Sequence, residues 1–244
     1  MESQRIAELL HPFLSNPLSD HQLNSISTYI DILLFWNARI NLTAVRQPEE
    51  IVTRHFGESL FVARHLFSPA EPGGCAVEPA PVPRPHKPSA AFERSHSARL
   101  IDVGSGAGFP GLAIKIYAPD IHVTLIESNQ KKATFLREVS RALTLMDVDV
   151  FAGRAEAFQA LADIVTLRAV ERFQDSISVA ARLVAPTGCL ALLIGRRQLG
   201  SLPEIAPAFL WHEPVPVPLS ESRVLVIGTS NPLLYQVRNE SRLQ

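Results

Sequence analysis

From residue 99 onward, short runs of apolar residues alternate with amphipathic stretches along the chain. The amphipathic stretch 129–143 places Phe135, Leu136 and Val139 on one face of a helix. Apolar strands that alternate with such helices are typical of a parallel sheet covered on both faces. We therefore predict an α/β fold. The runs that predict its strands are residues 99–103, 122–127, 148–152, 162–167, 189–194 and 223–228.

The last part of this region lacks the alternation. Residues 209–229 contain two apolar runs, joined by a polar segment that has prolines and no helical period. Strands joined by a short connection pair antiparallel, because a parallel pair needs a long crossover. We therefore expect a mostly parallel sheet with an antiparallel last strand.

Residues 1–67 have a helical period instead. Ser19 begins the longest amphipathic segment, and with Gln22 three residues later it forms a capping-box pattern. Pro48 and the two glutamates after it suit the first turn of a second helix, and the segment 57–67 has the pattern of a third. We expect these residues to form an N-terminal helical extension.

A proline-rich segment follows the helical extension. Residues 68–98 contain seven prolines, which remove backbone hydrogen-bond donors and block both helix and central strand. We expect an insert or linker here, either a tolerated surface insertion or a lid over a site. The chain thus divides into the helical extension, this insert and an α/β domain over residues 99–244.

Composition limits the class of protein. The chain is 46% hydrophobic and 19% charged, and no apolar run approaches the ~20 residues that a membrane span requires. The formal net charge is −1, so any nucleic-acid-binding surface would be local. Cys75 and Cys189 lie far apart and form neither a disulfide framework nor a zinc-binding spacing. We expect a cytoplasmic protein with no metal and no membrane partner.

The segment after the first predicted strand, DVGSGAGFPG, is rich in glycine. Its first glycines are residues 104, 106 and 108, and Phe109 stands where a dinucleotide-binding loop has its third glycine. The next predicted strand ends in Glu127, whose carboxylate can accept hydrogen bonds from both hydroxyls of a ribose. An acidic residue, this loop and an acidic second strand together resemble the S-adenosylmethionine-dependent methyltransferases of the Rossmann-like class. Alternatively, the glycines only form a tight turn and Glu127 is a solvated strand end.

Different methyl acceptors require different residues. Methylation of a pyrimidine at C5 needs a cysteine nucleophile, but Cys189 lies in an apolar strand and Cys75 in the insert. Enzymes that methylate exocyclic amino groups commonly have an Asn/Asp-Pro-Pro-aromatic loop after the fourth strand, where this chain has VTLRAV. Guanine N7 has a free lone pair and needs no base. Arg168 of that segment could stack on a guanine or donate hydrogen bonds to it.

Five segments together resemble the ribosomal RNA small subunit methyltransferase G family, also called glucose-inhibited division protein B. The resemblance implies transfer of a methyl group from S-adenosylmethionine to N7 of a guanosine in 16S ribosomal RNA. It also implies 16S rRNA or the small ribosomal subunit as the partner. The segments are WNARINLTAVRQPEEIVTRHFGESL (36–60), DVGSGAGFPGLAI (102–114), LIESNQKKATFLREV (125–139), GRAEAF (153–158) and VTLRAV (165–170).

The resemblance also implies which residues contact the cofactor. Arg168 would lie where cofactor and guanine meet, which makes it the expected catalytic residue; its structural alternative is an ion pair with a nearby carboxylate. Ala155 and Glu156 would flank the adenine. The expected cofactor contacts are Gly104, Phe109, Ala155, Glu156 and Arg168 from the resemblance, and Gly106, Gly108 and Glu127 from the spacing of loop and strands.

Several basic residues are candidates for RNA contacts. Arg54 and His55 could face the RNA or form hydrogen bonds inside the protein. Arg196 and Arg197 follow the fifth predicted strand, from where they could reach phosphates. The segment 129–143 could form a phosphate-binding face or a solvated helix surface. Its basic residues are Lys131, Lys132, Arg137 and Arg141.

Two residues depart from the family pattern: Ile194 stands where the family usually has lysine, and Glu58 where it usually has aspartate. Two alternatives to rRNA methylation follow from the sequence. The near-neutral charge suits methylation of a small molecule or a protein, and Ile194 suits a cofactor-binding RNA-interaction protein that has lost catalysis. An NAD-dependent oxidoreductase is disfavoured by Phe109 and by the absence of a Tyr-x-x-x-Lys pair. We expect a monomer.

Overall fold

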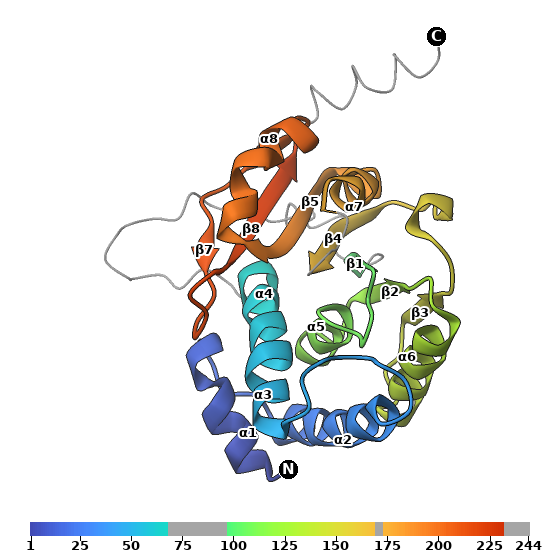
Figure 1. Cartoon of the computed structure of the whole chain (residues 1–244), viewed down its shortest axis with the longest axis vertical. Coiled ribbons are helices and arrows are strands. Elements are labelled where there is room, and N and C mark those ends of the chain that lie inside the picture. Colours follow the sequence, from blue (N-terminus) through green and yellow to red (C-terminus); the bar gives the residue numbers. More distant parts are fainter. Residues whose placement is uncertain (68–96, 169–172, 232–244) are drawn as a thin grey trace, which may run out of the picture.

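The computed structural model describes residues 1–67, 97–168 and 173–231, which are built around one mixed sheet of eight strands (Figure 1). Seven strands follow the order β3-β2-β1-β4-β5-β8-β6, and β7 also pairs with β8. The strands are β1 Arg99–Val103, β2 His122–Ile126, β3 Val148–Phe151, β4 Ala162–Arg168, β5 Val184–Gly195, β6 Phe209–Trp211, β7 Val215–Pro216 and β8 Arg223–Ser230.

The strand pairing confirms the predicted fold class. β1 pairs in parallel with β2 and β4, β2 pairs in parallel with β3, and β4 with β5. β8 pairs antiparallel with β5, β6 and β7. The sheet is therefore mostly parallel with an antiparallel end, as expected. The apolar run that starts at residue 209 forms two short strands, β6 and β7, rather than one.

β5 is longer than predicted, because it begins at Val184 rather than at the start of the apolar run 189–194. Pro186 makes this stretch look like a turn in the sequence. In the structure Pro186 is exposed, and the pairing of β4 with β5 shifts register near its start. Such an irregularity tolerates the missing N–H of a proline.

The helices follow the predicted pattern with one difference. The capping box is present: Ser19 Oγ accepts from the Gln22 N–H at 3.3 Å, and the Ser19 N–H donates to Gln22 Oε1 at 2.9 Å. The second and third predicted helices are continuous, because a π-helical turn, Val52–Gly57, connects α3 to α4. The helices are α1 Ser3–Leu10, α2 Asp20–Asn37, α3 Pro48–Ile51, α4 Glu58–Phe67, α5 Gly111–Tyr117, α6 Gln130–Ala142, α7 Phe173–Ala181 and α8 Leu202–Ile205.

Two hydrophobic clusters cover the two faces of the sheet. Alternate residues of a strand point to opposite faces, so Leu100 belongs to one cluster and Ile101 to the other. The first cluster joins the sheet to α1, α2, α4, α5 and α6, and the second joins it to α7 and α8. Figure 1 shows α2 and α4 beside α5. The N-terminal helices therefore share a hydrophobic core with the sheet.

Most of the predicted insert, residues 68–96, lies outside the described part of the chain. Within residues 1–67, 97–168 and 173–231, no helix combines the length and apolar character needed to cross a membrane.

Candidate active site

The strand order of the sheet reverses next to β1. From β1 the chain proceeds through β2 to β3 on one side, and then returns to β4 and β5 on the other. At such a switch point the loops separate and leave a crevice, where the ligands of open α/β sheets bind. The glycine loop, residues 104–108, follows β1 at this point. The fold therefore places the predicted cofactor loop where a ligand is expected.

The backbone of this loop requires glycine. Gly104, Gly106 and Gly108 have φ angles of 69°, 57° and 84°, which residues with a Cβ rarely adopt. A Cβ on Gly108 would collide with the hydroxyl of Tyr29, whereas a Cβ on Gly104 would meet no atom within 4 Å. Gly108 thus permits close packing against α2, and Gly104 borders open space that a ligand can approach.

Glu127 follows β2 and holds the loop in place. Its Oε2 accepts from the Gly106 N–H at 2.9 Å, and its Oε1 accepts from the Asn129 N–H at 2.7 Å. Glu127 is only 7% exposed, so it is not a solvated strand end. Each carboxylate oxygen has two lone pairs, which leaves capacity to accept hydrogen bonds from the hydroxyls of a ribose.

Asp102 lies in β1, buried beneath the glycine loop. Its carboxylate accepts from Thr166 Oγ1 at 2.8 Å and from the Gly111 N–H at 3.1 Å. Burial raises the pKa of this carboxyl to about 6, although both hydrogen bonds act in the opposite direction. Asp102 therefore fastens β4 and the first turn of α5 below the loop. The sequence showed the acidic residue but not these partners.

The N-terminal helices contact the loop from one side. The Tyr29 hydroxyl donates to the carbonyl oxygen of Ala107 at 2.6 Å. The ring of Phe109 stacks on Tyr29, with centroids 5.4 Å apart, and on His55, with centroids 4.9 Å apart. Since this ring packs within the helical layer, the predicted cofactor contact of Phe109 would use its backbone.

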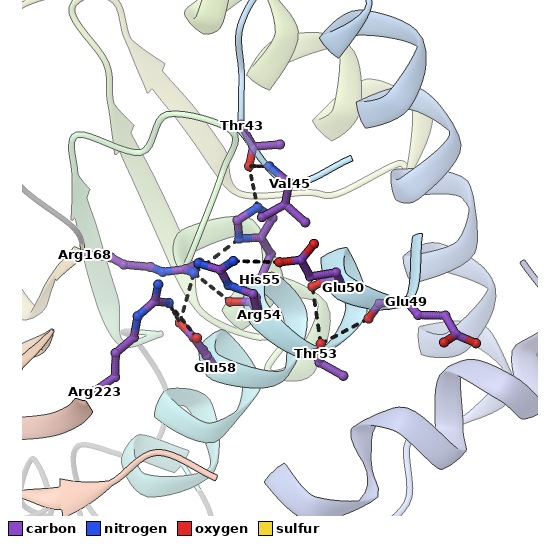
Figure 2. Close-up of polar contacts among 10 residues, drawn as sticks. All are labelled: Thr43, Val45, Glu49, Glu50, Thr53, Arg54, His55, Glu58, Arg168 and Arg223. Carbon is purple, nitrogen blue, oxygen red and sulfur yellow. Dashed lines mark hydrogen bonds and ion pairs between the residues drawn. The ribbon is translucent and has the colours of Figure 1, made fainter. Parts of the chain in front are cut away.

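Arg168 ends β4 and belongs to a buried ion-pair cluster (Figure 2). Its Nη2 donates to the carbonyl oxygen of Arg54 at 2.6 Å and to Glu58 Oε2 at 2.9 Å, and lies 3.2 Å from His55 Nδ1. Glu58 Oε1 also accepts from Arg223 Nη1 at 2.6 Å. Burial lowers the pKa of the Arg168 guanidinium to about 10, an effect that Glu58 opposes, so Arg168 is protonated at neutral pH. The structural alternative, an ion pair, is present, and the catalytic role of Arg168 stays a prediction.

His55 is an internal, neutral residue of this cluster. Burial, followed by the charges of the neighbouring arginines, lowers its pKa to about 3. Nδ1 of His55 faces Arg168 Nη2 at 3.2 Å, and its Nε2 forms a hydrogen bond with Thr43 Oγ1 at 2.7 Å. Arg54 is half exposed and pairs with Glu50 at 2.6 Å. Of the two interpretations of Arg54 and His55, the internal hydrogen bonds are the one that the structure displays.

The other predicted residues follow the carboxyl ends of parallel strands. Ala155 and Glu156 belong to a short 3₁₀ turn after β3, where Ala155 is half-buried and Glu156 exposed. Arg196 and Arg197 are exposed in the 3₁₀ helix after β5. The structure therefore brings all four residues to the edge of the sheet that carries the glycine loop.

A cavity of about 270 Å³ lies at the start of α6. Asn129, whose N–H binds Glu127, also caps α6 by accepting from the N–H groups of Lys131 and Lys132. The opposite wall is the loop after α2, which contributes Arg39; its place beside α6 has no local signal in the sequence. The lining residues are Arg39, Ile40, Asn41, Asn129, Lys131 and Lys132.

The sequence missed three partners in the site, because each comes from a distant segment. Tyr29 was visible only as a residue of an amphipathic helix, and Arg223 only as the first residue of a strand. Glu58 was noted as a departure from the family but not as the carboxylate between two arginines. In the described part of the chain, no cluster of three His, Cys, Asp or Glu residues could hold a metal ion.

The switch point of the sheet, the glycine loop and the buried acid after β2 define the Rossmann-like fold of class I S-adenosylmethionine-dependent methyltransferases. A sequence model of the rRNA small subunit methyltransferase G family matches residues 22–71 and 87–217. The chain belongs to this family. The family, the fold class and the cofactor predicted from the sequence are thereby confirmed.

Relatives from two organisms show how far the similarity extends. The ribosomal RNA small subunit methyltransferase G of Chloroflexus aggregans is 36% identical over 229 residues, which cover 87% of this chain and 84% of that protein. That of Roseiflexus castenholzii is 34% identical over 223 residues, covering 86% and 84%. Among solved structures, a SAM-dependent methyltransferase from Aquifex aeolicus has a TM-score of 0.46 and 17% identity, covering 56% of this chain and 84% of that chain.

Proposed function

We propose that this protein transfers the methyl group of S-adenosylmethionine to N7 of a guanosine in 16S rRNA. Family membership supports the reaction and the rRNA substrate. The observation that carries the proposal is the buried Glu127 carboxylate, which fixes the glycine loop and keeps acceptor capacity at the switch point of the sheet.

The residues at the switch point fit the cofactor. Glu127 would accept from the ribose hydroxyls, and the open backbone at Gly104 would receive the amino-acid end. Ala155 and Glu156, after β3, would flank the adenine. When bound, S-adenosylmethionine supplies an electrophilic methyl group on a sulfonium. The glycine loop itself carries no basic side chain that would repel this positive charge.

Guanine N7 has a free lone pair, so no residue has to remove a proton. The chain must instead orient the base in line with the methyl group and exclude water. Arg168 suits this role because Glu58 and the Arg54 carbonyl fix its guanidinium, which is protonated at neutral pH. An arginine can donate to the O6 acceptor of guanine, beside N7.

Local basic surface supports an RNA substrate. The whole chain has a net charge of −1, yet the cavity at the start of α6 is lined by Arg39, Lys131 and Lys132. Arg196 and Arg197 add two exposed cations after β5. Basic groups gathered along one edge can bind phosphates although the whole protein is not basic.

The decisive experiment is mass spectrometry of nucleosides from purified 16S rRNA. We expect 7-methylguanosine to decrease in a deletion strain, and to be restored by the wild-type chain but not by Arg168→Ala. Arg182→Ala, at an exposed position between α7 and β5, is the matched control and should restore it. Borohydride and aniline cleavage followed by primer extension would then locate the nucleotide.

Two outcomes would reject the proposal. An unchanged 7-methylguanosine content after deletion would favour a small molecule or a protein as the acceptor. Calorimetric binding of S-adenosylmethionine, without methyl incorporation into rRNA or small subunits, would favour an RNA-interaction protein that has lost catalysis. Ile194, which motivates the second alternative, is 4% exposed and packs in the core on the α7 face.

A further inference from the structure

A cavity of about 190 Å³ lies at the carboxyl edge of the sheet, beyond β4 from the glycine loop in the strand order. The ends of β4 and β5 contribute Arg168 and Gly195 to it, and the start of β8 contributes Arg223. Gln198 of the 3₁₀ helix after β5 and Ser222 complete its polar lining. The resemblance pointed to Arg168 alone among these residues.

The charged residues that line the cavity are both cations. Arg168 and Arg223 share one carboxylate, that of Glu58, as Figure 2 shows, and the charge of the buried Asp102 also acts on Arg168. His55 is neutral, and Arg54 has its own partner in Glu50. No Asp or Glu among the described residues lines the cavity itself.

The polar groups that line the cavity are mainly donors. Gln198 Oε1 accepts from the Gly195 N–H at 2.9 Å, which leaves its NH₂ group as a pair of donors. Arg168 uses Nη2 for its protein partners, and Arg223 uses Nη1. Within the described part of the chain, the other guanidinium nitrogens have no hydrogen-bond acceptor. A partly buried, donor-rich site whose lining holds two cations and no carboxylate favours an anion with several acceptor oxygens.

We propose that this cavity binds a phosphodiester group of the RNA substrate, with Gln198 and Arg223 as previously unassigned contacts. A phosphodiester carries a negative charge, which suits a lining of two arginines, and its oxygens match the planar guanidinium fork. The carboxylate of the cofactor has similar chemistry, but the glycine loop follows β1, whereas the cavity is lined from β4, β5 and β8, and no residue of the loop belongs to its lining. This inference rests on the proposed function, since RNA must be the substrate.

Gln198→Glu tests the cavity with little change in shape. The new side chain keeps an oxygen for the Gly195 N–H and replaces the NH₂ donors with a negative charge. It substitutes no residue of the Arg168–Glu58–Arg223 cluster. We expect the Kd for small subunits or 16S rRNA, measured by filter binding, to rise about tenfold, the size of one lost charge-assisted hydrogen bond. The Kd for S-adenosylhomocysteine, measured by calorimetry, should stay within about twofold.

Two further variants serve as check and control. Ser222 is exposed and also lines the cavity. Ser222→Asp therefore adds a negative charge there without substituting Gln198, and should weaken RNA binding as Gln198→Glu does. Asn16→Asp adds it in the exposed loop before α2 and should not. The inference is overturned if the RNA Kd of both cavity variants equals that of the wild type. It is also overturned if the variants lose as much affinity for S-adenosylhomocysteine as for RNA, because the cavity would then bind the cofactor carboxylate. Methyl transfer by the wild-type chain is measured separately, so a failure of the proposed function is told apart from a failure at the cavity.

Discussion

The hydroxyl of Tyr29 donates a 2.6 Å hydrogen bond to the carbonyl oxygen of Ala107, so that α2 holds the loop proposed to bind the cofactor. Burial raises the pKa of this phenol well above its usual value, which keeps it protonated and able to donate. The N-terminal helices are therefore part of the support of the site as well as of the core.

Tyr29→Phe removes only this donor. We expect the free energy of unfolding to fall by about 1–2 kcal/mol, because a buried carbonyl loses its partner. The Kd for S-adenosylmethionine should rise several-fold as the loop relaxes. Ser140→Ala is a control, because it removes a buried hydroxyl that donates to Leu136 within α6. It should reduce stability in urea unfolding without changing the Kd for S-adenosylmethionine. If this Kd rises equally in both variants, Tyr29 does not support the cofactor loop specifically.

Glu127 should contribute to cofactor binding through the ribose. We expect Glu127→Ala to raise the Kd for S-adenosylhomocysteine at least about tenfold, in the range of hydrogen bonds to a charged group. Glu127 also anchors the glycine loop. The 2′-deoxy analogue of S-adenosylhomocysteine, which lacks one ribose hydroxyl, therefore separates ribose binding from loop anchoring. The wild type should bind this analogue more weakly than S-adenosylhomocysteine, and Glu127→Gln should bind the two more nearly alike. If both proteins discriminate equally in calorimetry, the carboxylate does not bind the ribose.

Glu58→Gln leaves Arg168 and Arg223 side by side without their carboxylate. We expect a loss of about 3 kcal/mol in the free energy of unfolding, because a buried ion pair loses one partner, and a fall in kcat for rRNA methylation. The double variant Glu58→Gln/Arg223→Gln removes one cation as well and should recover part of the stability. A double variant that is less stable than Glu58→Gln would show that charge imbalance is not the cause.

His55 makes stability depend on pH with a definite sign. It is neutral in the native state down to about pH 3, whereas it titrates near its ordinary value of 6.5 in the unfolded chain. Between these values the unfolded state binds more protons, so the contribution of His55 is lost as the pH falls from 6.5 toward 3. Asp102 acts in the opposite direction, since its raised pKa favours the native state at low pH and this contribution is lost as the pH rises through about 6.

Urea unfolding at pH 7 and pH 5 can measure the contribution of His55 to the free energy of unfolding. His55→Gln should be less stable than the wild type at pH 7 and should lose less stability on acidification. His21→Gln, at an exposed position on α2, is the control and should keep the wild-type difference between the two pH values. The same difference in His55→Gln would show that this histidine is not held neutral by the fold.

The basic cavity at the start of α6 should bind RNA through charge alone. Each phosphate contact on a single strand contributes about −0.7 to the slope of log K against log salt. Lys131→Gln/Lys132→Gln should therefore flatten this slope by about 1.4 if both lysines contact phosphates. Cofactor affinity should stay unchanged, because both substituted residues keep the backbone N–H groups that donate hydrogen bonds to Asn129. An unchanged salt slope would assign these lysines to a solvated helix surface.

Local sequence patterns predicted most of the fold. The central strands and α6 have strong apolar periods, and the Ser19 capping box forms as expected. The errors occur where tertiary pairing overrides a local signal. Pro186 lies within β5 because an exposed, irregular part of the ladder tolerates it, and α3 continues into α4 because a π-helical turn joins the two segments.

The candidate site was predictable only in part. Glu127 and the glycine loop lie in one β-α-β unit, where spacing along the chain determines proximity. The partners of Arg168 and Tyr29 depend on how the N-terminal helices pack against the sheet, which no short motif encodes. Arg223 meets Glu58 because β8 inserts antiparallel beside β5. Such contacts between distant segments need the folded structure.

The Glu58 ion pairs also bear on how the length of this chain can vary. Glu58 precedes the connection between Phe67 and Arg99, whereas Arg168 and Arg223 follow it, so the cluster joins the two parts of the chain directly. Because these ion pairs join residues outside the connection, a change in its length would leave Glu58 and the two arginines directly paired. The family match leaves residues 72–86 of the connection unmatched.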